Sequence, residues 1–244
     1  MSSLIRTAKH APTRGKDVDL RIALLAPQDR IKPYGDTVEQ ITVSNAAAPV
    51  AKGATSITVT ALTANVIKIA AGQVLRFEDQ VTGREYLAYV SANAAAAATS
   101  LDVVALDEAI PDGAIAEFPA YVWDRTDSSV TKSYNFSGTT TYNTGDNEDG
   151  VVTGYTADIT LPGIDYHYND GLKTALTAAR LGQECWVSKI KPAPNDNFER
   201  GEVREGPAVT TSESEGAAAD AFQSRDLEMK WVGDIDELPA LAKA

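Results

Sequence analysis

Two stretches in the second half of the chain are patterned as half-buried β-strands. Val130–Phe136 alternates apolar with polar residues, and Val151–Leu161 is rich in β-branched residues. The segment between them, Gly138–Gly150, is too polar to pack in a core. We therefore predict a long hairpin whose tip faces solvent or a partner.

Apolar residues at helical spacing follow over Asn169–Leu181, with Leu172 and Leu176 on one stripe. Asn169 or Asp170 can cap the start of such a helix, and Gly182 suits the left-handed position that ends one. The pattern predicts a helix that lies across a sheet and covers one of its faces.

Three further stretches show an extended pattern and are predicted to be strands: Gly15–Leu25, Cys185–Ile190 and Asp226–Gly233. Before the last of these, Val209–Asp220 is polar and is predicted to be a flexible crossing. Cys185 is the single cysteine, which excludes an internal disulfide framework and a zinc cluster built from several thiolates. We expect Cys185 to be a buried residue of its strand.

An internal repeat distinguishes residues 44–120 from the rest of the chain. Gly53–Val59 recurs as Ala97–Val103, 44 positions later, and Ala71–Phe77 recurs as Asp112–Phe118. Neither copy alone could bury its apolar face. We therefore predict a small β domain of two copies joined by Glu85–Val90. It would be inserted into a main domain formed by residues 1–43 and 121–244.

The composition is that of a globular protein. The 244 residues are 43% hydrophobic. No stretch of about 18 apolar residues occurs, and the first residues lack the apolar region of a signal peptide, so we expect no membrane association and folding in a cytoplasm.

The net charge of −12 is concentrated toward the end of the chain, with −6 on residues 202–244. Binding DNA or RNA by neutralising phosphates requires clustered lysine and arginine, so this balance argues against it. It is compatible with a protein that lets DNA pass without holding it, because like charge keeps a polyanion from sticking to a wall.

The sequence offers no catalytic constellation, and we predict no catalytic residue, metal or cofactor. No nucleophile elbow, Walker loop or dinucleotide-binding glycine pattern occurs. The two histidines are His10 and His167, so a hydrolase would need His167 near Asp165 with a nucleophile such as Ser188. The acidic run Asp146–Gly150 has a faint likeness to a calcium loop, but Ala157 stands where the bidentate glutamate is required.

The order of these elements resembles the major tail tube proteins of long-tailed bacteriophages. The resemblance rests on the Thr-rich hairpin, Ala157–Gly163, the helix, Glu184–Val187, Ser212–Gly216 and the closing Trp231-Val232-Gly233 strand. It covers residues 1–30 loosely and 121–235 more firmly. It implies a mainly β chain, with a β-sandwich or barrel flanked by one helix, to which the small β domain is an addition.

The resemblance also implies a function. Six copies would form a ring, and the rings would stack into a hollow tube through which the genome passes as double-stranded DNA without specific binding. Other partners would be the tape-measure protein and further tail proteins. The chain would not be an enzyme, and it would lie in the virion tail after assembly in the cytoplasm of a bacterial host.

Two groups of carboxylates are candidates for the lumen or for contacts between rings: Asp146, Glu148 and Asp149, and Glu213 and Glu215. Ordinary solvated loop charge is the competing interpretation. We expect the inserted domain to lie on the outer surface, because a bulky domain in the bore would obstruct DNA.

A second hypothesis is a carbohydrate-binding or decorating virion surface protein. Sugar binding needs exposed aromatic side chains close to carboxylates. Residues 44–120 contain both, namely Phe77, Tyr86 and Tyr89 with Glu78, Asp79 and Glu85.

Overall fold

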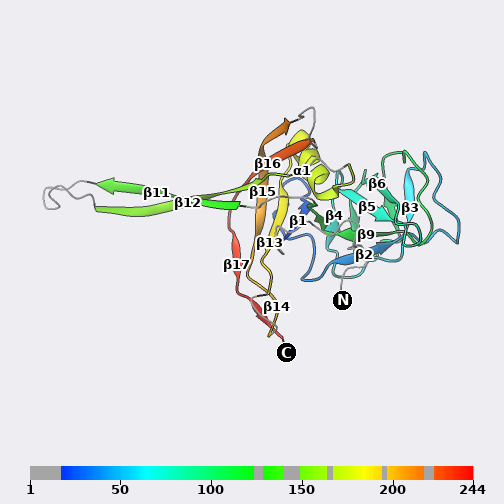
Figure 1. Ribbon diagram of the computed structural model, residues 1–244, viewed down its shortest axis with the longest axis horizontal. Helices are drawn as coiled ribbons and strands as arrows, with labels where there is room; N and C mark the ends of the chain where they lie inside the picture. Colours follow the sequence, from blue (N-terminus) through cyan, green and yellow to red (C-terminus); the bar gives the residue numbers. More distant parts are fainter. Residues whose placement is uncertain are drawn as a thin grey trace.

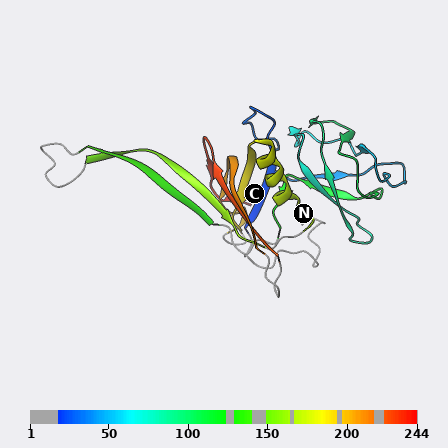
Figure 2. The same cartoon turned by 90° about the horizontal axis from the view of Figure 1, so that it is seen from above.

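The computed structural model describes residues 18–123, 129–139, 149–163, 167–193, 197–216 and 223–243. The fold is mainly β with one helix in the described residues, as predicted. Figures 1 and 2 show an elongated molecule, in which a hairpin projects from one side of a central sheet and a small β unit lies on the other side.

The central sheet, here called the main sheet, has eight strands in the order β10-β1-β13-β15-β16-β12-β11, with β17 also paired to β15. All its pairs are antiparallel. The strands are β1 (Asp19–Leu24), β10 (Ala120–Tyr121), β11 (Ser129–Thr139), β12 (Asp149–Leu161), β13 (Cys185–Ile190), β15 (Val203–Gly216), β16 (Ser224–Trp231) and β17 (Asp236–Leu238). A separate pair joins β14 (Phe198–Arg200) to β18 (Leu241–Ala242).

The helix α1 (Asp170–Leu181) packs on one face of the main sheet. Its start and end are as predicted: Asn169 Oδ1 accepts a hydrogen bond from the Leu172 N–H over 3.0 Å, and Gly182 ends the helix at φ +66°. The sandwich expected from the resemblance is here one hydrogen-bonded sheet with a helix on it. Buried apolar residues of both build the core: Leu20, Ile22, Leu24, Ile159, Leu161, Leu172, Ala175, Leu176, Val187, Leu227, Met229 and Trp231.

Residues 39–118, here called the small unit, are built around a second hydrophobic core, to which Ala23, Leu25, Tyr34 and Trp186 also contribute. They form a four-stranded sheet in the order β2-β9-β5-β6 and two short pairs, β3–β8 and β4–β7. The strands are β2 (Glu39–Thr42), β3 (Ser56–Thr58), β4 (Lys68–Ile69), β5 (Val74–Glu78), β6 (Glu85–Tyr89), β7 (Ala94–Ala95), β8 (Ser100–Asp102) and β9 (Ile115–Phe118).

The two copies of the repeat pair with each other. Ile57 of β3 lies opposite Leu101 of β8, which is its own counterpart in the second copy, and both are fully buried. Equivalent hydrogen bonds flank this pair: the Val59 N–H donates to the Thr99 carbonyl and the Val103 N–H to the Thr55 carbonyl, each over 2.9 Å. The copies are therefore related by a pseudo-twofold axis.

The segment expected to join the copies is itself a strand of the second copy. β6 pairs with β5 as β2 pairs with β9, so Glu39–Thr42 is the counterpart of Glu85–Tyr89. The first copy thus begins before residue 44. The sequence hid this start, because β2 carries a single large apolar residue, Ile41.

The prediction of a flexible crossing over Val209–Asp220 is wrong for the residues up to Gly216. These residues belong to the 14-residue strand β15. From Ala208 to Gly216 it pairs with β16, with a bulge between Thr210 and Ser212. Residues 211–216 are all exposed, so no side chain there needs to be apolar. A strand exposed on both faces lacks the alternation by which sequence patterns are recognised.

The small unit docks at the β1 end of the main sheet. Along the outer edge of β1, Ile22 pairs with Ala120, and the Val122 N–H donates to the Leu20 carbonyl over 3.0 Å. The Leu24 N–H donates to Gln73 Oε1 of the small unit over 2.8 Å. The outer edge of β1 is therefore covered by Gln73 and by β10, the short last strand at this end of the sheet.

Candidate assembly surface

The opposite end of the main sheet is open. β12 pairs with β16 only over Asp158–Leu161, whereas its pairing with β11 runs from Thr160 out to Asp149. The ribbon of residues 129–139 and 149–157, here called the arm, projects from the body (Figures 1 and 2). In the described chain the outer edge of β11 has no paired strand. A two-stranded ribbon is marginally stable alone, and an unpaired edge is a template for another chain.

An exposed aromatic pair lies on one face of the arm. Tyr134 and Tyr155 are opposite each other, with ring centroids 6.1 Å apart, and are 63% and 42% exposed. The Lys132 ammonium lies 5.0 Å from the centre of the Tyr155 ring. Ala157 and Ile159, further along the same face of β12, are buried in the main core. The arm therefore continues the core face of the sheet into solvent.

Charged contacts hold the base of the arm to β17. Lys132 Nζ forms an ion pair with Glu237, and Arg204 Nε lies 3.3 Å from the same carboxylate. The hydrogen bond from Lys132 is the main cause that lowers the pKa of Glu237. Sequence analysis missed this contact, because nothing local to Glu237 indicates so distant a partner.

The carboxylates predicted for the lumen are placed only in part. Asp146 and Glu148 lie outside the described residues, and Asp149 is the first residue of β12. Glu213 and Glu215 are exposed on β15, where the Arg225 guanidinium of β16 contacts them over 2.9 and 3.1 Å. The charge of these two carboxylates is thus partly offset.

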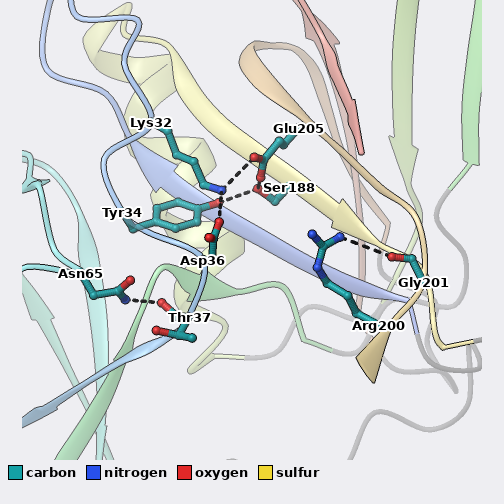
Figure 3. A network of polar contacts seen from close by, with 9 residues as sticks. All are labelled: Lys32, Tyr34, Asp36, Thr37, Asn65, Ser188, Arg200, Gly201 and Glu205. Atoms are coloured by element: carbon teal, nitrogen blue, oxygen red, sulfur yellow. Dashed lines mark hydrogen bonds and ion pairs between the residues drawn. The ribbon is translucent and has the colours of Figure 1, made fainter. Parts of the chain in front are cut away.

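Ser188, the nucleophile that a hydrolase would need, is 1% exposed and is engaged in a structural network (Figure 3). Its hydroxyl donates to Glu205 Oε2 over 2.7 Å and accepts from the Tyr34 hydroxyl over 2.6 Å. Lys32 Nζ lies 2.8 Å from Glu205 Oε1. Burial is the main cause that raises the pKa of Tyr34, which remains a donor.

This network fastens the segment between β1 and β2 onto β13 and β15. The Asn65 amide also donates to the Thr37 carbonyl, so the segment is held on the small unit as well (Figure 3). His167 is exposed and packs edge-on against Tyr168, while Asp165 lies outside the described residues. The hydrogen bonds of Ser188 help to hold the segment between β1 and β2 on the main sheet. Because its side chain is buried in these contacts, a substrate could not reach the hydroxyl.

The side chains proposed for carbohydrate binding do not form an exposed platform. Phe77 is 0% exposed and Tyr86 is buried, while Tyr89 is half-buried. Glu85 is buried beside Arg76, with 2.7 Å between Oε1 and Nη1. The sequence pattern was misleading because these aromatics serve the core of the small unit.

No group of three or more His, Cys, Asp or Glu side chains within the described ranges could hold a metal ion. Cys185 is buried as predicted, and burial raises the pKa of its thiol to about 12. No helix in the described part of the chain is long and apolar enough to cross a membrane.

No known protein family and no curated protein matches the sequence. Three solved structures resemble about half of the chain. A chain of the virion of a native gene transfer agent (GTA) particle is 16% identical, with 48% of this chain and 86% of that chain covered and a TM-score of 0.38. A chain from the tail of an empty GTA particle with C6 symmetry is 16% identical, with coverages of 51% and 85% and a TM-score of 0.38.

The third is a chain from the baseplate of the anti-feeding prophage (AFP), which is 10% identical, with coverages of 50% and 84% and a TM-score of 0.40. The three particles are thus a virion, a tail and a baseplate. Likeness at this level does not establish a function for this chain.

Proposed function

We propose that this chain is a structural subunit of a phage-type tail, which assembles with copies of itself through the arm. The observation that carries the proposal is the arm itself: an exposed tyrosine pair on an extension of the core face, beside the open edge of β11. A neighbouring copy that covers this face would bury the rings and pair the edge, which the subunit cannot do alone.

The finer proposal follows the sequence resemblance. Six copies form a ring, rings stack into a hollow tube, and double-stranded DNA passes through it. The tape-measure protein and other tail proteins are the further partners, and the subunit has no enzymatic activity. Its place is the virion tail, after assembly in the host cytoplasm. The net charge of −12 supports this role, because it disfavours adhesion of phosphate.

The docking of the small unit supports its placement outside the bore. Because the small unit lies beside β1, where Gln73 accepts a hydrogen bond from Leu24, contacts between neighbouring sheets would use the β11 side. The inserted domain, expected at residues 44–120, then lies on the outer surface. Since Arg225 offsets Glu213 and Glu215, the carboxylates Asp146, Glu148 and Asp149 are the stronger candidates for the lumen or the contacts between rings.

Negative-stain electron microscopy with sedimentation velocity tests the proposal. We expect the protein to form rings or tubes as its concentration rises, and the double variant Tyr134→Ala/Tyr155→Ala to stay monomeric with an unchanged circular dichroism spectrum. Val81→Ala, which alters a 93% exposed residue of the small unit, is the control and should assemble normally.

Two results would contradict the proposal. One is a wild-type protein that remains monomeric at every concentration. The other is a double variant that forms the same assemblies as the wild type, which would show that assembly does not require the tyrosine pair of the arm.

A further inference from the structure

A cluster of buried charged side chains lies where the small unit meets the start of α1. At its centre is Arg76 of β5, which is 2% exposed. Its Nη1 lies 2.7 Å from Glu85 Oε1, and its guanidinium stacks 4.0 Å from the centre of the Trp123 ring. The Trp123 indole N–H donates to Asp170 Oδ1 of α1 over 3.1 Å. These contacts join β5, β6 and α1.

Carboxyl groups outnumber the guanidinium in this cluster. Glu78 lies directly opposite Glu85 in the β5–β6 pair, and these two and Asp170 are 2%, 5% and 3% exposed. Glu117, on the neighbouring strand β9, is half-buried and acts on Glu78 electrostatically. Glu78 Oε2 is buried and has no hydrogen-bond partner among the described residues. Burying a carboxylate without a paired charge is costly, so this arrangement favours the protonated form of Glu78 and of Asp170.

We propose that this cluster is a proton-dependent latch between the small unit and the main sheet. With protons on Glu78 and Asp170, the small unit stays docked on Trp123 and the first turn of α1. When both groups ionise, two charges lie buried at the junction and Glu78 is repelled by Glu85 and Glu117, so the docking weakens. The groups that face them are Arg76 on β5, Glu85 on β6 and Glu117 on β9.

The expected pH dependence follows from the direction of the shifts. Burial is the main cause that raises the pKa of Asp170, from 3.8 to about 7, against the opposing charge of Arg76. Burial also raises the pKa of Glu78, and Glu85 and Glu117 add to that shift. A raised carboxyl pKa stabilises the docked state fully below the ordinary pKa, and this stabilisation is lost as the pH rises through the docked-state value.

For Asp170 the stabilisation therefore falls between about pH 4 and pH 7. One such proton changes the docking equilibrium by up to about tenfold per pH unit. The latch lies within one subunit and does not depend on assembly, so it is tested on the monomer and is independent of the proposed tail function.

Hydrogen exchange of individual amides, corrected for intrinsic rates, measures the latch at pH 6 and pH 8. Val74 N–H, which donates to Thr174 Oγ1, and Leu172 N–H, which donates to Asn169, report on the docked face. We expect their protection to fall about tenfold between the two pH values. Amides of β16 should keep their protection.

Three variants assign the effect to the cluster. Asp170→Asn keeps an acceptor for the Trp123 indole and should remove most of the pH dependence, and Glu78→Gln should reduce it. Asp102→Asn, which removes an exposed carboxylate of the small unit, is the matched control and should behave as the wild type.

Equal protection at both pH values in the wild type would overturn the latch, as would an unchanged pH dependence in Asp170→Asn and Glu78→Gln. If these variants fail to fold, carboxyl ¹³C titration of the wild type decides. An aspartate carboxyl that titrates near pH 7 supports the latch, and the absence of any carboxyl that titrates above pH 6 overturns it.

Discussion

The arm and the small unit end the main sheet in opposite ways. At one end, the short strand β10 covers the outer edge of β1, Gln73 of the small unit accepts a hydrogen bond from Leu24, and the two repeat copies pair with each other. At the β11 end the edge is open, and Tyr134 and Tyr155 face solvent. The strands of the small unit thus pair with one another, whereas the arm leaves an open edge and two exposed rings. Stability and assembly should therefore respond to different mutations.

The largest effect is expected at the pseudo-twofold axis of the small unit. Ile57→Ala and Leu101→Ala each remove a fully buried side chain and should lower the free energy of unfolding by about 2–5 kcal/mol. Urea unfolding of each variant measures the loss, with Val81→Ala as the exposed control. A loss below about 1 kcal/mol in both would show that this core is not where the unit gains its stability.

A smaller loss of stability should distinguish the two repeat copies, because the first copy approaches Leu24 and Leu181 at Gly72 and the second has no such neighbour at Gly113. Gly72 (φ +96°) and Gly113 (φ +79°) occupy equivalent positions in the repeat. A Cβ at Gly72 would lie 2.8 Å from Leu24 Cδ2 and 2.9 Å from Leu181 Cδ1, whereas at Gly113 it would meet nothing within 4 Å. Both alanine variants pay about 1 kcal/mol for the backbone, and Gly72→Ala should lose about 1–3 kcal/mol more.

Thermal and urea unfolding of the two glycine variants compare these losses directly. Equal losses would mean that the close approach of Leu24 and Leu181 relaxes without cost, and would weaken the view that this turn is a docking site.

The smallest effect belongs to the base of the arm. Lys132→Met keeps the aliphatic stem but removes the ion pair with Glu237, whose side chain is 48% exposed. The free energy of unfolding should fall by at most about 1 kcal/mol at low salt, and by less at 1 M NaCl. Lys52→Met, on the exposed surface of the small unit, is the matched control. A loss that is independent of salt would point to lost packing on Tyr155 instead.

Features with a local signal could be predicted from the sequence. The helix was predicted because Asn169 and Gly182 mark its ends and because its apolar residues recur at helical spacing. The hairpin strands and β13 were predicted because they alternate in polarity, are rich in β-branched residues or show an extended pattern. The repeat was also visible, but similarity between two copies does not indicate that they pair with each other.

Features that depend on distant partners could not be predicted. The distal half of β15 is exposed on both faces, so only its pairing with β16 identifies it as a strand. The aromatic residues of β5 and β6 resembled a binding platform, because the sequence does not show whether an aromatic side chain is buried or exposed. The contacts of Glu237 with Lys132 and of Asp170 with Trp123 each join segments far apart in the chain.

The pairing of the two repeat copies has a consequence for how the molecule responds to dilution. Two separate chains that interlocked in this way would dissociate by mass action, but here the halves are covalently linked, so their effective concentration is fixed. The proposed contacts of the arm would instead be formed between molecules, and their occupancy would depend on the protein concentration. A dilute solution of this protein should therefore lose its assemblies long before any subunit unfolds, which makes disassembly reversible without refolding.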